Sequence, residues 1–249
     1  MKTLYQAIFL LLVLLMLTAC GRQEYHEDTY PAQTTEVEET TVAVTTAPTI
    51  PTLLETEVVT EPAPEPADAD FVRILDYIPT AQQELFYATD RNFTGQVIYN
   101  FEDACLRYGT VKKLMAVSED LEEMGLYLKI WDGFRPVSAQ FRLWEVCPDP
   151  TYVANPNVGY SSHSRGNTID LTLVDANGNE LEMPTGFDDF SQKADRDYSD
   201  CTAEAADNAR LLEIIMEKHG FAGYSGEWWH YSDTVRYEVE MVFEPADRE

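Results

Sequence analysis

A sharp change in composition near residue 70 limits how much of this 249-residue chain can fold. Residues 21–69 are rich in Thr, Glu, Pro and Val, and Arg22 is the only Lys or Arg among them. Such a segment cannot bury enough apolar surface to offset the entropy lost on ordering, so we expect a disordered acidic linker rather than a binding segment. Its prolines and mutually repelling charges favour an extended spacer. Residues 70–249 are then left to form one domain.

The first 20 residues are typical of an export signal. Lys2 precedes an uninterrupted apolar run from Ile8 to Leu17, which is too short to be expected to span a membrane as a helix. Leu17-Thr-Ala-Cys20 follows, so the segment resembles a bacterial lipoprotein signal, in which the cysteine is acylated and becomes the mature N-terminus. The alternative is an ordinary secretory signal that happens to contain Cys20. Both predict export, and the first predicts lipid anchoring at the extracytoplasmic face of the bacterial cell membrane.

The formal net charge of −27 argues against two kinds of partner. Nucleic-acid binding needs clustered Lys and Arg to neutralise phosphates, and the chain has 17 such residues against 44 acidic ones. Docking on anionic lipid through a basic protein face is disfavoured for the same reason. We therefore expect no nucleic-acid partner, and membrane contact only through the N-terminal lipid.

Three cysteines remain after the signal: Cys105, Cys147 and Cys201. Their spacing does not resemble a zinc-binding cysteine cluster. Outside the cytoplasm two of them could oxidise to a disulfide, and the odd number leaves at least one unpaired. We expect Cys147 to pair with Cys201.

The periodicity of residues 70–249 predicts an α+β fold. Apolar residues follow helical spacing over 111–124 and 212–219, and Gly125 and Gly220 are plausible helix ends. Strand patterns cover 126–130, 168–174 and the aromatic, β-branched stretch 228–243. This mixture favours a central antiparallel sheet flanked by helices, in a single catalytic domain.

Elimination among the four histidines leaves two candidates for chemistry. His26 lies in the linker, and His219 falls in the last turn of a predicted helix, where an imidazole interacts favourably with the helix dipole. His163 and His230 remain. His163 lies in a polar, glycine-containing loop that leads into a strand containing Asp170 between two large apolar residues.

A buried aspartate needs a partner, which is a metal ion or a hydrogen-bond network. Taken alone, His163 and Asp170 favour a structural hydrogen-bonded pair. The second segment, Glu227-Trp-Trp-His230, places an acid and an imidazole three residues apart, a weak signal that also fits a surface turn. Together, the two segments supply two imidazoles, one carboxylate and a second, free carboxylate. A catalytic zinc site uses three N or O ligands and keeps a fourth position for water, whose proton a free carboxylate can take.

Two ordered motifs carry a resemblance to a known family: Ser161-x-His163-x-x-Gly166-x-x-x-Asp170 and Glu227-x-Trp229-His230. They are similar to those of the VanX-type zinc D-alanyl-D-alanine dipeptidases, which belong with the zinc D-Ala-D-Ala carboxypeptidases. The resemblance covers most of residues 75–231, including 87–95, 131–136 and 224–231. One departure is Thr168, where the family commonly has alanine. The predicted export signal also departs from family members that work in the cytoplasm.

The resemblance implies a role for each motif residue. It implies one zinc ion per chain held by His163, Asp170 and His230, with Glu227 as the base that activates water. Arg135 takes the place of the family arginine that stabilises the developing oxyanion; a salt bridge behind a turn is the alternative.

The same resemblance implies residues on the substrate side of the site. Asp188 matches the carboxylate near the free amine of the substrate, and Ser161 matches a substrate-side hydroxyl. Tyr87 is a weaker pocket candidate that could instead belong to the core.

The implied function is zinc-dependent hydrolysis of the small dipeptide D-alanyl-D-alanine to two D-alanines, in cell-wall peptide metabolism. One alternative is a D,D-carboxypeptidase that trims the terminal D-Ala from peptidoglycan stem peptides. Another is a non-catalytic lipoprotein that binds D-amino-acid peptides or zinc. Glu227 argues against the second alternative, because simple binding needs no general base.

Overall fold

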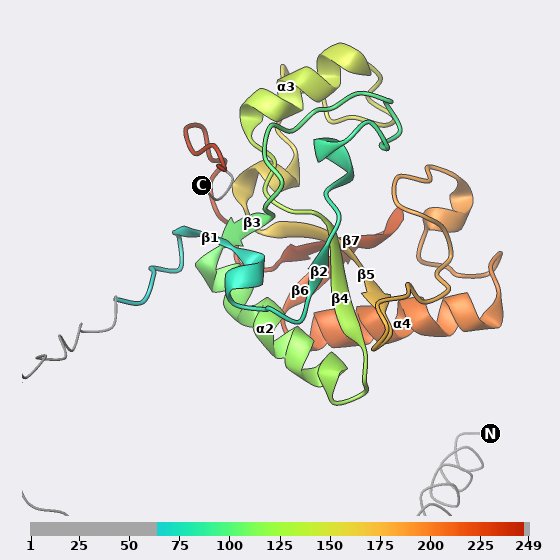
Figure 1. The fold of residues 1–249 in the computed structure, drawn as a ribbon. Coiled ribbons are helices and arrows are strands. Elements are labelled where there is room, and N and C mark those ends of the chain that lie inside the picture. The colour runs from blue at the N-terminus through green and yellow to red at the C-terminus, as the bar shows by residue number, and fades with distance from the viewer. Residues whose placement is uncertain (1–63, 247–249) are drawn as a thin grey trace, which may run out of the picture. The chain divides into compact units, whose positions relative to one another are not determined.

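The computed structural model describes residues 64–246 (Figure 1). The predicted signal at 1–20 with Cys20, and most of the linker predicted for 21–69, lie outside these residues. Among the described residues, no helix combines the length and the apolar character that crossing a membrane requires.

The architecture is built on a five-stranded sheet with the strand order β2-β4-β5-β7-β6. All neighbouring strands are antiparallel except β2 and β4, which pair in parallel over two residues at one edge. A separate two-stranded sheet pairs β1 with β3. The strands are β1 (Phe71–Arg73), β2 (Gln82–Gln83), β3 (Cys105–Arg107), β4 (Tyr127–Asp132), β5 (Thr168–Val174), β6 (Phe221–Tyr224) and β7 (Glu227–Asp233).

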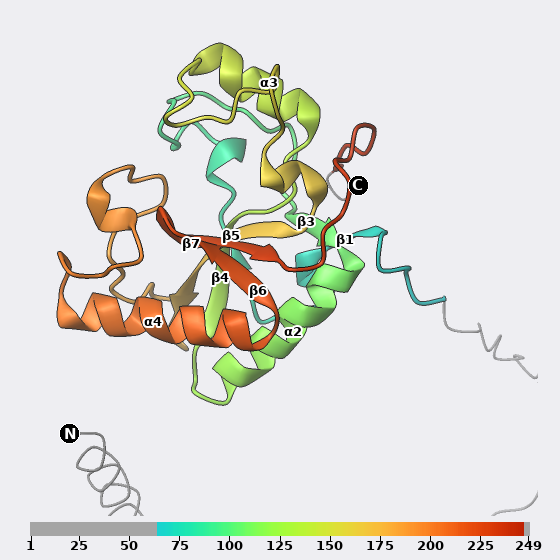
Figure 2. The same ribbon diagram turned by 180° about the vertical axis from the view of Figure 1, so that it is seen from behind.

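Within residues 64–246, three α-helices and several short 3-10 helices accompany the sheet, which confirms the predicted α+β class. Figures 1 and 2 show α2 and α4 together along one side of the sheet and α3 on the other. The longer helices are α2 (Tyr108–Glu122), α3 (Val137–Val146) and α4 (Ala203–Lys218). The short 3-10 helices are η2 (Ile74–Asp76), η3 (Phe86–Ala88), η4 (Ser162–Arg165) and η5 (Gln192–Ala194).

The helix boundaries follow from local chemistry. The side chain of Thr202 accepts a hydrogen bond from the Ala205 backbone N–H and caps the start of α4. Gly125 and Gly220 follow α2 and α4 with φ of 71° and 85°, a left-handed conformation that glycine adopts without strain. The buried side chains of α2 recur every three or four residues, so one face of the helix joins the core: Val111, Leu114, Val117 and Leu121.

The central strand β5 is buried along its whole length and separates two kinds of environment. Its side chains alternate between faces, so Ile169, Leu171 and Leu173 share one face and join the hydrophobic core. The opposite face carries the polar residues Thr168 and Asp170. This alternation places a carboxylate in the interior of the domain, where it needs partners.

The predicted disulfide between Cys147 and Cys201 is wrong, because both thiols are free, as is that of Cys105. Cys147 follows α3, whereas Cys201 lies just before α4. The sheet lies between these two helices in both views (Figures 1 and 2). The sequence spacing of the cysteines could not show this separation.

Candidate active site

The register of the three central strands brings polar residues side by side. On β5, Asp170 pairs with Asp132 of β4 on one side and with His230 of β7 on the other. Asp132 follows a register shift in β4, which moves it opposite Asp170. Residues that are 38 and 60 positions from Asp170 in the chain, as their numbers show, therefore become its neighbours.

His163 reaches the same place from η4, which precedes β5. The Ser161 hydroxyl accepts a hydrogen bond from the backbone N–H of His163 at 3.3 Å and caps this turn. Gly166 ends it with φ of 76°, and a Cβ on that residue would lie 2.4 Å from the ring of Phe71. Only glycine fits both the backbone conformation and the close approach.

Three predicted ligands converge on one point. The Nε2 atom of His163 lies 3.3 Å from Nδ1 of His230 and 3.3 Å from Oδ2 of Asp170. His230 Nδ1 lies 3.0 Å from Oδ1 of Asp170. Atoms bound tetrahedrally to one zinc ion at about 2.0–2.1 Å lie roughly 3.3 Å apart, so the observed spacing matches a shared ion.

The hydrogen bonds around these residues support the same fit. His163 Nδ1 lies 2.7 Å from the Gly133 carbonyl oxygen and donates to it, so the lone pair on Nε2 faces His230 and Asp170. Asp170 Oδ1 is buried and accepts no hydrogen bond. Burial alone would raise the pKa of Asp170, but His163 and His230 hold it below its usual range. Facing lone pairs around an ionised carboxylate are suited to a cation such as zinc.

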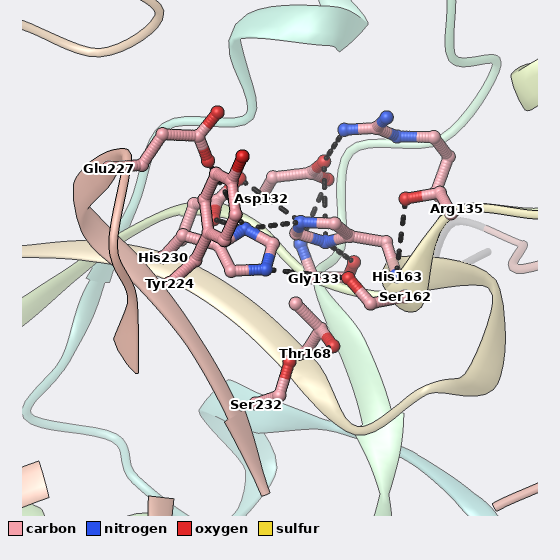
Figure 3. A network of polar contacts seen from close by, with 12 residues as sticks. Asp132, Gly133, Arg135, Ser162, His163, Thr168, Tyr224, Glu227, His230 and Ser232 are labelled. Atoms are coloured by element: carbon pink, nitrogen blue, oxygen red, sulfur yellow. Dashed lines mark hydrogen bonds and ion pairs between the residues drawn. The ribbon is translucent and has the colours of Figure 1, made fainter. Parts of the chain in front are cut away.

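Glu227 lies beside this cluster at the start of β7. Its Oε2 atom is 3.4 Å from His230 Nδ1, and Figure 3 shows the carboxylate next to the imidazole. Burial raises the pKa of Glu227, and the negative charge of Asp170 raises it further. A carboxylate with a raised pKa accepts a proton more readily near neutral pH, as a general base must.

Arg135 lies on the other side of His163 (Figure 3), and three neighbours fix its side chain. Its Nη2 donates to Asp132 Oδ2 at 2.6 Å, its Nε to the Tyr99 hydroxyl at 3.1 Å, and its Nη1 to Gln140 Oε1 at 3.2 Å. A guanidinium carries five N–H groups, so two are left for other acceptors. Arg135 thus forms the salt bridge considered from the sequence and also lines the cavity.

Asp132 is the functional residue that the sequence reasoning missed. Its Oδ1 accepts hydrogen bonds from the Tyr99 hydroxyl at 2.7 Å and the Gly133 N–H at 2.8 Å, and its Oδ2 lies 3.7 Å from His163 Nδ1. One buried carboxylate therefore fixes the Arg135 guanidinium and lies close to the His163 imidazole without a hydrogen bond to it. The available signal was an acid at the end of a strand, three residues before the arginine of the 131–136 motif.

Asp188 and Tyr87 form a pair on the opposite wall. The Tyr87 hydroxyl donates to Asp188 Oδ2 at 2.8 Å, and Tyr87 is itself buried, so it serves both the core and the cavity. Asp188 has φ of 55°, which is uncommon for a residue with a side chain and is often found at functional sites. Burial raises the pKa of Asp188 to about 8.

All eight site residues predicted within the described domain line one cavity of about 350 Å³. Several lining residues were not predicted, and aromatic side chains are prominent among them: Tyr152, Tyr160, Phe190 and Tyr224. Ser162 also lines it, and its hydroxyl lies 3.4 Å from His230 Nε2. His219 lies elsewhere, with Nε2 2.6 Å from Asp120 Oδ2, as its exclusion from the site predicted.

Thr168, the departure from the family pattern, lies next to the cluster on β5. Its hydroxyl is 2.8 Å from that of Ser232 on β7, and Figure 3 shows this pair below the imidazoles. The extra hydroxyl therefore has a partner on the neighbouring strand, and the ligands still converge.

Comparison with known proteins decides the family. The family model described as D-ala-D-ala dipeptidase matches residues 67–241. The chain belongs to the D-Ala-D-Ala dipeptidase family. This confirms the resemblance inferred from the motifs, and it makes the chain a peptidase of a zinc family. Among its described residues, His163, Asp170 and His230 form the set whose chemistry fits that ion.

Curated relatives cover most of the domain. The D-alanyl-D-alanine dipeptidase of Escherichia coli K12 is 40% identical over 163 residues, which are 65% of this chain and 83% of the relative. The enzyme of the same name from Enterococcus faecium is 35% identical over 165 residues, covering 58% and 82% of the two chains.

Similarity to solved structures is more distant. The vancomycin-resistance D,D-pentapeptidase VanY in complex with Zn(II) is 16% identical with a TM-score of 0.35, over 53% of this chain and 74% of that one. The LD-carboxypeptidase LdcB is 20% identical with a TM-score of 0.37, over 54% and 64%.

Proposed function

We propose that this protein is a zinc-dependent dipeptidase that hydrolyses D-alanyl-D-alanine to two molecules of D-alanine. The observation that carries the proposal is the convergence, in one cavity, of a three-ligand cluster with Glu227 and Arg135. Family membership and relatives that bear this name support the same substrate. Because peptidoglycan stem peptides end in D-Ala-D-Ala, hydrolysis of this dipeptide belongs to cell-wall peptide metabolism.

Glu227 is the proton carrier in this proposal. His163, Asp170 and His230 would hold the zinc ion, which would supply a Lewis acid to polarise a carbonyl group and make water a better nucleophile. Glu227 takes a proton from the attacking water and later delivers it to the leaving amine. Its position 3.4 Å from a ligand nitrogen keeps its carboxylate beside the reacting atoms.

Arg135 stabilises the negative charge that develops on the carbonyl oxygen. Two of its N–H groups are not engaged by Asp132, Tyr99 or Gln140, and the side chain lines the cavity. Because its partners already fix the guanidinium, little reorganisation is needed when charge appears.

Asp188 binds the free ammonium group of the dipeptide. Its carboxylate is buried with Tyr87 as its hydrogen-bond donor. Burial raises its pKa to about 8, so a positively charged partner is needed to favour its ionised form near neutral pH. A substrate with a free amino terminus supplies that charge, which favours dipeptides over longer stem peptides. Ser161 offers a further hydroxyl on the cavity wall.

The test is a substrate panel with the zinc-reconstituted protein. The panel contains D-Ala-D-Ala, L-Ala-D-Ala, L-Ala-L-Ala, N-acetyl-D-Ala-D-Ala and a stem pentapeptide ending in D-Ala-D-Ala. We expect rapid release of D-alanine from D-Ala-D-Ala and little from the acetylated dipeptide or the pentapeptide. Faster cleavage of the pentapeptide would instead identify a D,D-carboxypeptidase.

The matched control is Glu227→Gln, which keeps the shape of the side chain but removes the base. We expect zinc content to stay at one ion per chain while kcat falls by about 10²–10⁴-fold. Near-normal kcat in the zinc-loaded variant would refute the role of Glu227. Binding of the dipeptide without turnover in the native protein would favour a non-catalytic binding protein.

We further propose that the enzyme is exported and lipid-anchored through Cys20 at the extracytoplasmic face of the bacterial membrane. The apolar run Ile8 to Leu17 and the Leu17-Thr-Ala-Cys20 sequence support this location. In bacteria fed a labelled fatty acid, the native protein should carry label and sediment with membranes, whereas Cys20→Ala should not be labelled. An unlabelled native protein in the medium would indicate an ordinary secretory signal.

A further inference from the structure

We propose that Arg196 is a positioning residue for the reaction, an inference that rests on the proposed dipeptidase function. It holds the β6–β7 hairpin, which carries Glu227 and His230, against the segment that carries Asp188. The base, a metal ligand and the ammonium-binding carboxylate then depend on one guanidinium that does not line the cavity.

Arg196 bridges both ends of the hairpin turn. Its Nε donates to the Tyr224 carbonyl oxygen at 2.8 Å. Its Nη2 donates to the carbonyl oxygens of Trp228 at 3.0 Å and His230 at 3.1 Å. Its Nη1 donates to the Tyr231 hydroxyl at 3.1 Å. Glu227 lies within the segment that these bonds enclose, so its backbone is fixed on both sides.

The hairpin needs this support because its strand pairing is interrupted. The ladder passes from Gly223↔Tyr231 directly to Tyr224↔Glu227. The residues in between on β7, which end with His230, therefore have no partner on β6. Arg196 donates to two carbonyl groups of this bulge, where a regular strand would have used backbone N–H groups.

Gly223 leaves space for the Arg196 guanidinium, and Glu213 provides a nearby negative charge. A Cβ on Gly223 would lie 2.3 Å from Cζ of Arg196, so only glycine leaves room for it. The Arg196 side chain is 9% exposed, and Glu213 Oε1 lies 3.4 Å from its Nη1. The Tyr231 ring lies 4.4 Å from Cζ, a distance that suits a cation–π contact.

The same residue connects the hairpin to the substrate side of the cavity. Arg196 lies eight positions after Asp188, in the connection between β5 and α4. Its backbone N–H donates to the Ser225 carbonyl oxygen at 3.3 Å. Loss of the guanidinium should therefore displace Glu227 and His230. Their distances to Asp188 should change as a result.

The test compares Arg196→Lys and Arg196→Met with the native full-length protein. Lysine keeps the charge but lacks the planar fork that reaches Tyr224, Trp228 and His230 together. We expect both variants to lose about 10–100-fold in kcat and in zinc affinity measured by chelator competition, as for other groups that orient metal ligands. These values are measured well below the melting temperature of each variant.

Gly223→Ala tests the proposal without removing the arginine, because its methyl group displaces the guanidinium. We expect the same direction of change in kcat and zinc affinity, and little additional loss in the double variant Arg196→Met/Gly223→Ala. Arg142→Met, at an exposed position on α3, is the matched control and should leave both quantities unchanged. If Arg196→Met does not fold, Gly223→Ala alone decides.

Two outcomes overturn the proposal. One is a lower melting temperature of the Arg196 variants with kcat and zinc affinity within about twofold of native, which would show a purely structural role. The other is full recovery by lysine. A native protein that binds zinc but cleaves no dipeptide would refute the proposed function instead, and zinc affinity would still report on Arg196.

Discussion

The two walls of the cavity are built differently. The sheet wall carries Asp170 and His230 on adjacent strands, and register fixes their separation from each other and from the buried Asp132 on β4. The loop wall carries Tyr87 on a 3-10 helix and Asp188 on an irregular segment with strained backbone. Strand pairing suits groups that must meet within tenths of an ångström around an ion, whereas loops can vary to recognise a substrate. We therefore expect substitutions in the sheet wall to lower the rate of hydrolysis. Substitutions in the loop wall should instead change the preference among substrates.

The largest effect should follow from Asp170→Ala. This change removes the central ligand and leaves the two imidazoles without the carboxylate that both contact. We expect loss of bound zinc and a rate no higher than that of the protein-free reaction, measured by metal analysis and D-alanine release. Asp207→Ala, at an exposed position on α4, is the control. Retained zinc in the Asp170 variant would disprove the ligand assignment.

Asp132→Asn should have the next largest effect on the sheet wall. The amide keeps the size of the side chain but leaves the buried Arg135 guanidinium without its counter-charge. We expect about 10–100-fold lower activity and a loss of roughly 3–5 kcal/mol in unfolding free energy. Steady-state kinetics measure the activity, and urea unfolding measures the free energy of unfolding. Asp120→Asn removes a solvent-screened ion pair with Lys218 and should cost far less stability.

Asp188→Asn should change selectivity on the loop wall. Asparagine tolerates the positive φ and retains an acceptor for the Tyr87 hydroxyl, so the backbone should be preserved. Losing a charged hydrogen bond of about 1.5–3 kcal/mol predicts roughly 10–100-fold lower kcat/KM for D-Ala-D-Ala, chiefly through KM. N-acetyl-D-Ala-D-Ala, which lacks the ammonium, should be hydrolysed equally slowly by both proteins. A decrease confined to kcat would instead indicate that Asp188 takes part in the chemical step.

The same substitution should stabilise the metal-free protein in a pH-dependent way. Burial raises the pKa of Asp188 to about 8 from 3.8, so the folded state favours the neutral acid. The penalty for ionising it is absent below pH 3.8, grows as the pH rises, and is complete above about pH 8. Asp188→Asn should therefore raise the melting temperature more at pH 9 than at pH 5. An equal increase at both values would contradict the raised pKa.

The smallest effect should come from the two cysteines that lie away from the cavity, one after α3 and one before α4. Cys147 and Cys201 are both free thiols, so Cys147→Ser and Cys201→Ser break no disulfide. We expect changes within about 0.5 kcal/mol in unfolding free energy, and no effect of a reducing agent on the native protein. A marked loss of stability on reduction would show that these thiols form a disulfide.

The sequence determined the types and order of the reactive groups. His163, Asp170, Glu227 and His230 stand in motifs whose chemistry is legible from residue type and spacing, and the family resemblance added Arg135. Local periodicity also placed most of the long elements, such as β5 over 168–174. These features are local in the chain, so the sequence alone was sufficient to recognise them.

Only the tertiary structure decided which distant groups are neighbours. The pairing of β4 with β5 places Asp132 opposite Asp170, and nothing local predicted the bulge in β7 that Arg196 supports. The separation of Cys147 from Cys201 has the same origin. Strand order, register and unpaired carbonyl groups arise when segments far apart in the chain pack together, so spacing along the sequence carries little information about them.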